Sequence, residues 1–188
     1  AYYHDVAQVL GDGVPIVLQD FPLATNVHIA PEVIGRIVAE LPDMVMLKHE
    51  DWPGLSKITA IRNAESEGQR RISILCGNGG LFLPEELARG ADGAMTGFGY
   101  PEMMVKVTAL VAKGDMERAH DIFDAYLPLV RYEQQPGVGL AVRKHVLAQR
   151  GVIASPTIRR PGRGLSAEAL TEVDRLVSRQ ALRLDAIE

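Results

Sequence analysis

The chain has 188 residues, of which 47% are hydrophobic and 23% charged, and its formal net charge is −4. A chain of this length and composition can bury a substantial core, so we expect one soluble globular unit with a small appendage. The acidic balance favours neither nucleic acid nor a membrane surface as a partner, and no apolar run is long enough to predict a membrane span.

The first part of the chain alternates between predicted strands and helices. In chain order, the pattern predicts a strand at 14–20, a helix at 31–41, a strand at 44–48, a helix at 55–67, a strand at 71–77, a short helix at 84–89, a small-residue strand at 93–97 and a helix at 101–113. The strands are continuously apolar and end in polar residues, and Pro31 and Pro101 stand where a helix can begin. Alternation at this spacing indicates parallel βα units.

After Gly114 the pattern predicts helices without strands. An apolar stripe runs from Met116 to Val130, a second helix is expected at 138–149, and Ser166 is a suitable N-cap for a last helix through Ala181. Residues 150–164 are rich in Gly, Pro and Arg, which is typical of a loop. We therefore expect two parts, 1–113 and a helical extension at 114–188.

Polar residues gather at the carboxyl ends of the predicted strands, where parallel α/β folds bind their ligands. They are Gln19, Asp20, Lys48, His49, Glu50, Gly77, Asn78, Thr96 and Gly97. Burial disfavours a charged ammonium, so a lysine at an apolar strand end can present a free amine to a ketone. The segment around Lys48, taken alone, favours an ordinary lysine that extends to water. Four converging strand ends favour the functional interpretation.

Several segments together resemble a known family. PIVLQDFP, VMLKHED, ILCGNGG, GADGAMTGFGYPE and RYEQQPGVGLAVRKHVLAQRGVIAS, in this order, are similar to the N-acetylneuraminate lyase and dihydrodipicolinate synthase family of class I Schiff-base aldolases. The resemblance implies a (β/α)₈ TIM barrel with a C-terminal helical extension, a homo-oligomer (tetramer or dimer), and a barrel lysine that forms an imine with pyruvate or another 2-oxo acid. By position, it assigns that role to Lys48.

The length of the chain bears on this fold. A complete barrel of this kind takes about 250 residues, whereas the pattern here gives about four βα units and a tail. We therefore expect only the C-terminal half of a barrel, at 1–113, followed by the extension. Half a barrel leaves unpaired strand edges, which proteins avoid, so other material is expected to complete it.

Gln19 departs from the tyrosine that dihydrodipicolinate synthases and sialic acid lyases generally place there for proton transfer. Glutamine has no titrating proton, so acid/base work is expected to fall to Glu50, Asp20 or a water molecule. Gln19-Asp20 before the proline resembles the branch that dehydrates 2-keto-3-deoxy sugar acids, such as 2-keto-3-deoxyarabonate dehydratase. Two alternatives stay open: a 4-hydroxy-tetrahydrodipicolinate synthase, and a non-catalytic member that binds an oxo acid or serves in assembly.

A further set of residues is expected to hold the substrate. Backbone donors from Gly77 to Gly80 and the Thr96 hydroxyl are expected to hold the substrate, with Asp20, Asn78 and Gly97. The alternatives are a tight strand-to-helix turn at these glycines and an ordinary strand position for Thr96.

No metal is expected, because the histidines show no ligand spacing, and no cofactor beyond the imine with Lys48. The single cysteine, Cys76, excludes an internal disulfide framework and fits the cytoplasm. Helical lysines, Lys57 and Lys113 among them, are expected to be solvated.

Overall fold

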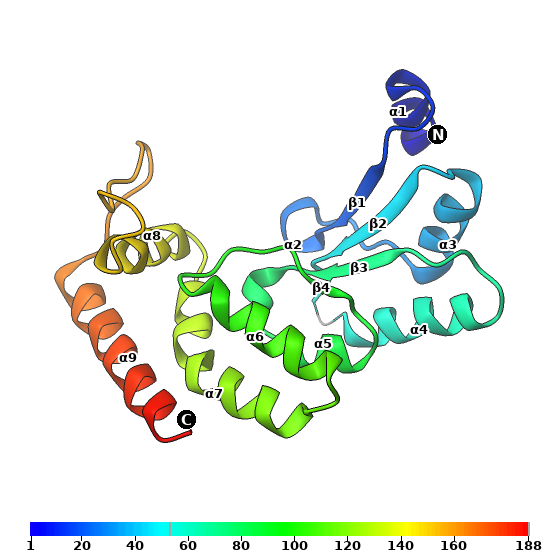
Figure 1. Ribbon diagram of the computed structural model, residues 1–188. Coiled ribbons are helices and arrows are strands. Elements are labelled where there is room, and N and C mark those ends of the chain that lie inside the picture. Colours follow the sequence, from blue (N-terminus) through cyan, green and yellow to red (C-terminus); the bar gives the residue numbers. More distant parts are fainter. Residues whose placement is uncertain (53, 188) are drawn as a thin grey trace. The chain divides into compact units, whose positions relative to one another are not determined.

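The computed structural model describes residues 1–52 and 54–187, and the chain divides into two compact units (Figure 1). The first unit comprises residues 1–77 and 85–95, and the second comprises 78–84 and 96–188.

The first unit is built on a parallel sheet. Its strands are β1 (Ile16–Asp20), β2 (Met44–His49), β3 (Ser73–Cys76) and β4 (Gly93–Ala94), in the order β1-β2-β3-β4. The helices in or entering this unit are α1 (Tyr2–Leu10), α2 (Pro22–Thr25), α3 (Pro31–Glu40), α4 (Leu55–Ser66) and α5 (Leu83–Ala88). The predicted parallel βα alternation is confirmed.

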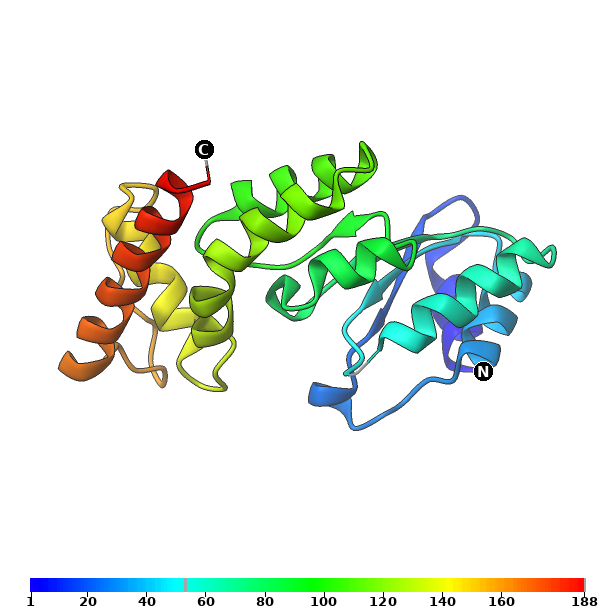
Figure 2. The ribbon, with the colours of Figure 1, turned by 90° about the horizontal axis from the view of Figure 1, so that it is seen from below.

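Helices α3 and α4 lie side by side over one face of the sheet (Figure 2). The core between them consists of buried aliphatic side chains, among them Leu18, Ile34, Leu47, Ile58 and Ile74. Because side chains alternate along a strand, the neighbours of these residues face the other way. Val17 and Gln19 are accordingly exposed, whereas Leu18 and Asp20 are buried.

A β-bulge in β2 sets the register of the first two strands. Ile16 pairs with Met44 but Val17 pairs with Met46, so that Val45 is an extra residue on β2. Beyond the bulge the pairing is regular, and Gln19 lies opposite Lys48. The bulge thus brings the lysine next to the glutamine.

Three predicted strands are longer than the observed ones, and one of them is β3, which spans Ser73–Cys76 where 71–77 was predicted. β1 begins at Ile16, because Pro15 has no amide hydrogen to donate to a neighbouring strand. β4 ends at Ala94 rather than Gly97, although the Met95 amide still donates to the Cys76 carbonyl at 2.9 Å. Thr96 is therefore the first residue past the ladder. The short helix α2 had no sequence prediction.

The second unit is helical, with α6 (Pro101–Ala112), α7 (Met116–Glu133), α8 (Gly139–Gln149), α9 (Ala167–Asp185) and the 3₁₀ turn η1 (Asn78–Gly80). α7 packs against α6, α8 and α9. Ser166 caps α9 as predicted and accepts a hydrogen bond from the Ala169 amide, and the helix runs four residues beyond the predicted end. None of the described helices is long and apolar enough to cross a membrane.

Candidate functional site

A lysine, a glutamine and a glutamate meet at the carboxyl ends of β1 and β2. Lys48 Nζ lies 3.1 Å from Glu50 Oε1, and the Gln19 amide donates to the same oxygen at 2.5 Å. The Lys48 side chain is 23% exposed and that of Glu50 only 9%. One largely buried carboxylate oxygen therefore fixes both the amine and the amide, and the lysine remains accessible.

Gly77, at the end of β3, makes room for Glu50. A Cβ atom at residue 77 would lie 2.0 Å from Glu50 Cγ and 2.6 Å from its Cδ. The Gly77 amide donates to the His49 carbonyl at 2.8 Å, which continues the ladder past β3. The glycine predicted to approach the substrate is thus also required by the position of the glutamate.

Asp20 belongs to a buried ion-pair network with α4. Lys57 Nζ lies 2.6 Å from Asp20 Oδ2 and 2.7 Å from Asp51 Oδ2. Burial opposes ionisation of Asp51, but the hydrogen bonds from Lys57 and the Trp52 amide outweigh it and hold the pKa of Asp51 below its ordinary value.

The expectation that Lys57 is solvated is wrong: the residue is 8% exposed, because two carboxylates compensate its burial. The Asp20 side chain is fully buried, and its Oδ1 has no hydrogen-bond partner among the described residues. One Asp20 oxygen is thus already engaged by Lys57. Contact of Asp20 with a substrate stays a prediction.

A second polar cluster lies on the buried side of the strand ends. His49 is 1% exposed, and its Nε2 lies 3.9 Å from Glu86 Oε1 of α5. Burial lowers the pKa of His49 and raises that of Glu86 to about 7. The buried Cys76 thiol is hydrogen-bonded to Glu86, and burial raises its pKa as well. Burial thus disfavours the charged form of each of these three groups.

The remaining predicted residues belong to the second unit. The Gly79 amide donates to Thr96 Oγ1 at 2.7 Å, which ties the turn after β3 to the residue after β4. Asn78 and Gly79 both have positive φ angles, 47° and 65°, so this is the tight turn that the glycines suggested. Gly97 lies against the guanidinium of Arg143.

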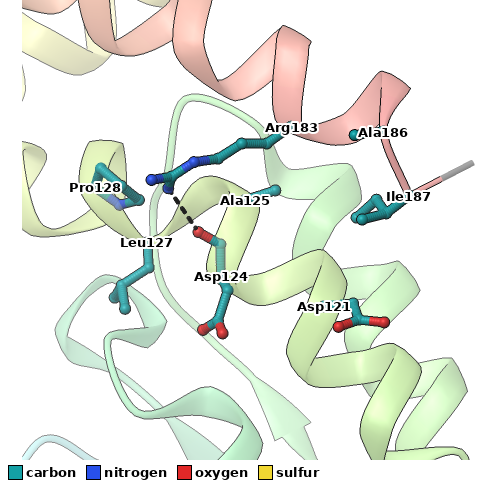
Figure 3. Close-up of a pocket in the computed structure, with 8 residues that line it drawn as sticks. All are labelled: Asp121, Asp124, Ala125, Leu127, Pro128, Arg183, Ala186 and Ile187. Carbon is teal, nitrogen blue, oxygen red and sulfur yellow. Dashed lines mark hydrogen bonds between the residues drawn. The ribbon is translucent and has the colours of Figure 1, made fainter.

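A pocket of about 560 Å³ lies elsewhere in the second unit, between α7 and α9 (Figure 3). Asp121, Asp124, Leu127, Pro128, Arg183 and Ile187 line it, and the Arg183 guanidinium donates to the Asp124 carbonyl at 3.4 Å. Among its described residues, the pocket lining holds no lysine, cysteine, serine or histidine that could act as a nucleophile. Within the described ranges, no group of three or more His, Cys, Asp and Glu is arranged to hold a metal ion. The strand-end cluster is the better candidate site.

Comparison with known families agrees with the motifs in the sequence. The model of the dihydrodipicolinate synthetase family matches residues 1–180. The chain belongs to this family.

Similar proteins in the dihydrodipicolinate synthetase family carry two kinds of name. An L-2-keto-3-deoxyarabonate dehydratase from Azospirillum brasilense is 28% identical over 148 residues, which cover 79% of this chain and 47% of that protein. A 4-hydroxy-tetrahydrodipicolinate synthase from Listeria welshimeri is 29% identical over 187 residues, which cover 94% of this chain and 58% of that protein. The chain thus spans about half the length of the curated relatives it matches.

A solved structure gives a closer match. The crystal structure of dihydrodipicolinate synthase from Rhodopseudomonas palustris has 54% sequence identity and a TM-score of 0.92, and the match covers 95% of this chain and 60% of that one. Both units of this family member therefore resemble that structure in fold.

Sequence patterns did not predict the roles of three charged residues of this chain. Lys57 and Arg143 carry no local signal, because helical periodicity does not show which carboxylates they meet. Glu133 does carry one: it follows Val130 by three residues and so continues the apolar stripe of α7. A carboxylate on an apolar stripe predicts burial with a compensating partner, and Arg143 is that partner, with Nε 2.5 Å from Glu133 Oε1.

Proposed function

We propose that the protein is a class I lyase in which Lys48 forms a covalent imine with the C2 ketone of a 2-oxo acid. The observation that carries this proposal is the contact of Lys48 Nζ with Glu50 Oε1 at 3.1 Å, at an accessible strand end. A lysine acts as a nucleophile in its neutral form, and Glu50 is within reach of the proton that the Lys48 ammonium must lose.

The reaction begins with transfer of a proton from the Lys48 ammonium to Glu50. The neutral amine adds to C2, the carbinolamine loses its hydroxyl as water with a proton returned by Glu50, and a protonated imine remains. This imine withdraws electrons from C3, so that a C3 hydrogen leaves as a proton to Glu50 and an enamine forms. Gln19 has no proton to exchange and orients the carboxylate through its 2.5 Å hydrogen bond.

The enamine can react in two ways. In a 2-keto-3-deoxy sugar acid, it expels the C4 hydroxyl as water, which is a dehydration. Glutamine at residue 19 and the similarity to the Azospirillum dehydratase support this first candidate. In the alternative, C3 of the enamine attacks an aldehyde, as in 4-hydroxy-tetrahydrodipicolinate synthesis, and the similarity to the Listeria and Rhodopseudomonas proteins supports that reaction.

The proposal also covers the fold around Lys48, the assembly of the protein and the residues that hold the substrate. Residues 1–113 supply the C-terminal half of a (β/α)₈ barrel and 114–188 its helical extension; the parallel strand order and the match to 60% of the Rhodopseudomonas chain support this. The enzyme needs no cofactor besides the imine, acts in the cytoplasm and assembles as a dimer or tetramer. The substrate is held by Asp20, Gly77, Asn78, Thr96 and Gly97.

Trapping tests the imine. Incubation of the intact protein with pyruvate and borohydride should reduce the imine to a stable adduct, which peptide mass spectrometry should locate on Lys48. Lys48→Ala should lose this adduct, whereas Lys113→Ala, which removes an exposed lysine after α6, should retain it. The absence of an adduct on Lys48 in the intact protein would favour a non-catalytic member of the family.

Product analysis separates the two lyase reactions. The protein should release water from 2-keto-3-deoxyarabonate if it is the dehydratase, and it should consume pyruvate with aspartate semialdehyde if it is the synthase. Glu50→Gln keeps the hydrogen-bonding shape but cannot take a proton, so it should slow either reaction by about 10²–10⁴-fold. Activity of that variant equal to the unsubstituted protein would remove Glu50 from the mechanism.

A further inference from the structure

Glu50 fixes the orientation of the side-chain amide of Gln19. Gln19 Nε2 lies 2.5 Å from Glu50 Oε1, and a carboxylate oxygen can only accept a hydrogen bond. The NH₂ group of the amide therefore faces Glu50, and the carbonyl oxygen Oε1 faces away from it. Glu50 in turn packs directly against the backbone of Gly77, where a Cβ atom would lie 2.0 Å from Glu50 Cγ. The direction of the Gln19 carbonyl is thus set by the packing of the first unit.

The Gln19 carbonyl oxygen is available to a ligand. The side chain stands on the exposed face of β1, and Oε1 has no hydrogen-bond partner in the part of the chain that the structure describes. An amide carbonyl has two lone pairs and can accept two hydrogen bonds. A ligand group that donates a hydrogen bond is therefore the complement of this atom.

This oxygen lies beside the amine of the proposed reaction. Gln19 and Lys48 are paired in adjacent strands, and both side chains contact the same Glu50 oxygen. Lys48 Nζ is 3.1 Å from that oxygen, so Nζ and Gln19 Nε2 are no further apart than the two contact distances together. In the imine, Nζ is bonded to C2 of the substrate, and an oxygen on C4 is three bonds from C2. A C4 hydroxyl is therefore within range of the amide.

We propose that Gln19 Oε1 accepts a hydrogen bond from the C4 hydroxyl of the imine-bound substrate and so selects a hydroxylated 2-oxo acid. The inference rests on the function proposed above, because the imine with Lys48 places the substrate. A hydroxyl donates to Gln19 and can still accept through its lone pairs, whereas the oxygen of an aldehyde has no hydrogen to donate. Gln19 is a specificity-determining residue that favours 2-keto-3-deoxy sugar acids.

The same hydrogen bond suits the dehydration step. Once the enamine has formed, Glu50 carries the proton taken from C3. The hydroxyl hydrogen points to Gln19, so a lone pair of the hydroxyl oxygen is left to accept the proton from Glu50. The C4–O bond breaks with its electron pair moving to the oxygen, and the enamine electrons form a C3–C4 double bond. Water and an unsaturated iminium result, Glu50 is again a carboxylate, and Gln19 has exchanged no proton.

Competitive trapping measures this selection. The intact protein is incubated with equimolar 4-hydroxy-2-oxopentanoate and 2-oxopentanoate, which differ only in the C4 hydroxyl, and is reduced with borohydride. Peptide mass spectrometry gives the ratio of the adducts on Lys48, with all adducts derived from the hydroxylated acid counted together. The same mixture with Nα-acetyllysine gives the reference ratio for an amine without a binding site. The unsubstituted protein should exceed that ratio by about twofold to tenfold, the contribution of one hydrogen bond.

Three variants assign the preference to the Gln19 carbonyl. Gln19→Met keeps the length of the side chain without the amide, and Gln19→Lys keeps a donor for Glu50 but has no acceptor. Both proteins should remain folded by circular dichroism and return to the reference ratio. A merely structural role of Gln19 would weaken the adducts of both acids together and leave their ratio unchanged. Val17→Ala, on the same exposed face of β1, should keep the ratio of the unsubstituted protein.

The reference ratio in the unsubstituted protein would overturn the assignment, as would a folded Gln19→Lys protein that keeps the preference. In both cases the adducts on Lys48 remain, so the imine stands. Absence of a Lys48 adduct with either acid would refute the imine and, with it, the role of Gln19.

Discussion

Substitution of Gly77 by alanine tests the packing that holds Glu50. The added Cβ would lie 2.0 Å from Glu50 Cγ, so the glutamate side chain must move. Residue 77 does not have a positive φ angle, and alanine therefore introduces no backbone strain of its own. The effect of the substitution comes from the displaced carboxylate.

The magnitude follows from the contacts that Glu50 loses. Its Oε1 gives up the hydrogen bond from Gln19 at 2.5 Å and the ion pair with Lys48 at 3.1 Å. A hydrogen bond to a charged group contributes about 1.5–3 kcal/mol, and overpacking of a well-filled site costs about 1–3 kcal/mol. Alanine recovers about 0.4–1 kcal/mol by restricting the unfolded chain. Relaxation of the side chain makes these terms overlap, so we expect the free energy of unfolding to fall by about 2–4 kcal/mol.

Urea denaturation followed by circular dichroism measures this change. Gly93→Ala is the matched control, because a Cβ there would meet Leu75 at 3.5 Å, an ordinary contact, and its stability should change by less than about 1 kcal/mol. In a Glu50→Ala background, Gly77→Ala should cost less than about 1 kcal/mol, because the clash is gone. Equal costs in the two backgrounds would refute the reasoning.

Three other predictions concern buried ionisable groups. Lys57→Ala leaves Asp20 buried without its cation and should lower the free energy of unfolding by about 3–5 kcal/mol, whereas exposed Lys113→Ala should stay within about 0.5 kcal/mol; similar urea midpoints would contradict this. The pKa of Glu86 is raised from 4.5 to about 7. The contribution of Glu86 to the free energy of unfolding is therefore fully present below pH 4.5 and is lost as the pH rises to 7, by about 3 kcal/mol at most. Glu86→Gln should remove that decline from a pH series of unfolding curves. Cys76 is buried with a raised pKa, so a thiol reagent should modify it only after unfolding, and rapid reaction of the native protein would count against its burial.

The pattern of apolar residues predicted helices and strands well where those apolar residues are the buried ones. The segment from Met44 to Lys48 is apolar throughout and forms a central strand, and the stripe from Met116 to Val130 forms α7. The sequence predicted strand boundaries less well, because pairing with a neighbouring strand sets them. Thr96 looks like a strand residue, but the hydrogen-bonded ladder ends one residue before it. A strand boundary depends on the neighbour as much as on the segment itself.

The candidate site divides in the same way. The convergence of Gln19 and Lys48 was predicted because parallel strands end at a common edge, and the register places these two residues opposite each other. The role of Lys57 could not be predicted, because its partner Asp20 lies 37 residues away and helical periodicity gives no sign of a buried ion pair. Local sequence patterns therefore locate the ends of strands. They do not show which side chains form a buried ion pair, because that depends on how the elements pack.

The bulge at Val45 has a consequence for insertions and deletions in this family. β2 uses four residue steps from Met44 to Lys48, where β1 uses three from Ile16 to Gln19. Loss of one residue between Met44 and Lys48 can be absorbed by closing the bulge, with the lysine still opposite Gln19. Loss of two would place Lys48 opposite Leu18, on the buried face, and bring His49 beside the glutamine. In related sequences a single gap in this strand is therefore compatible with a reactive lysine, and a double gap is not.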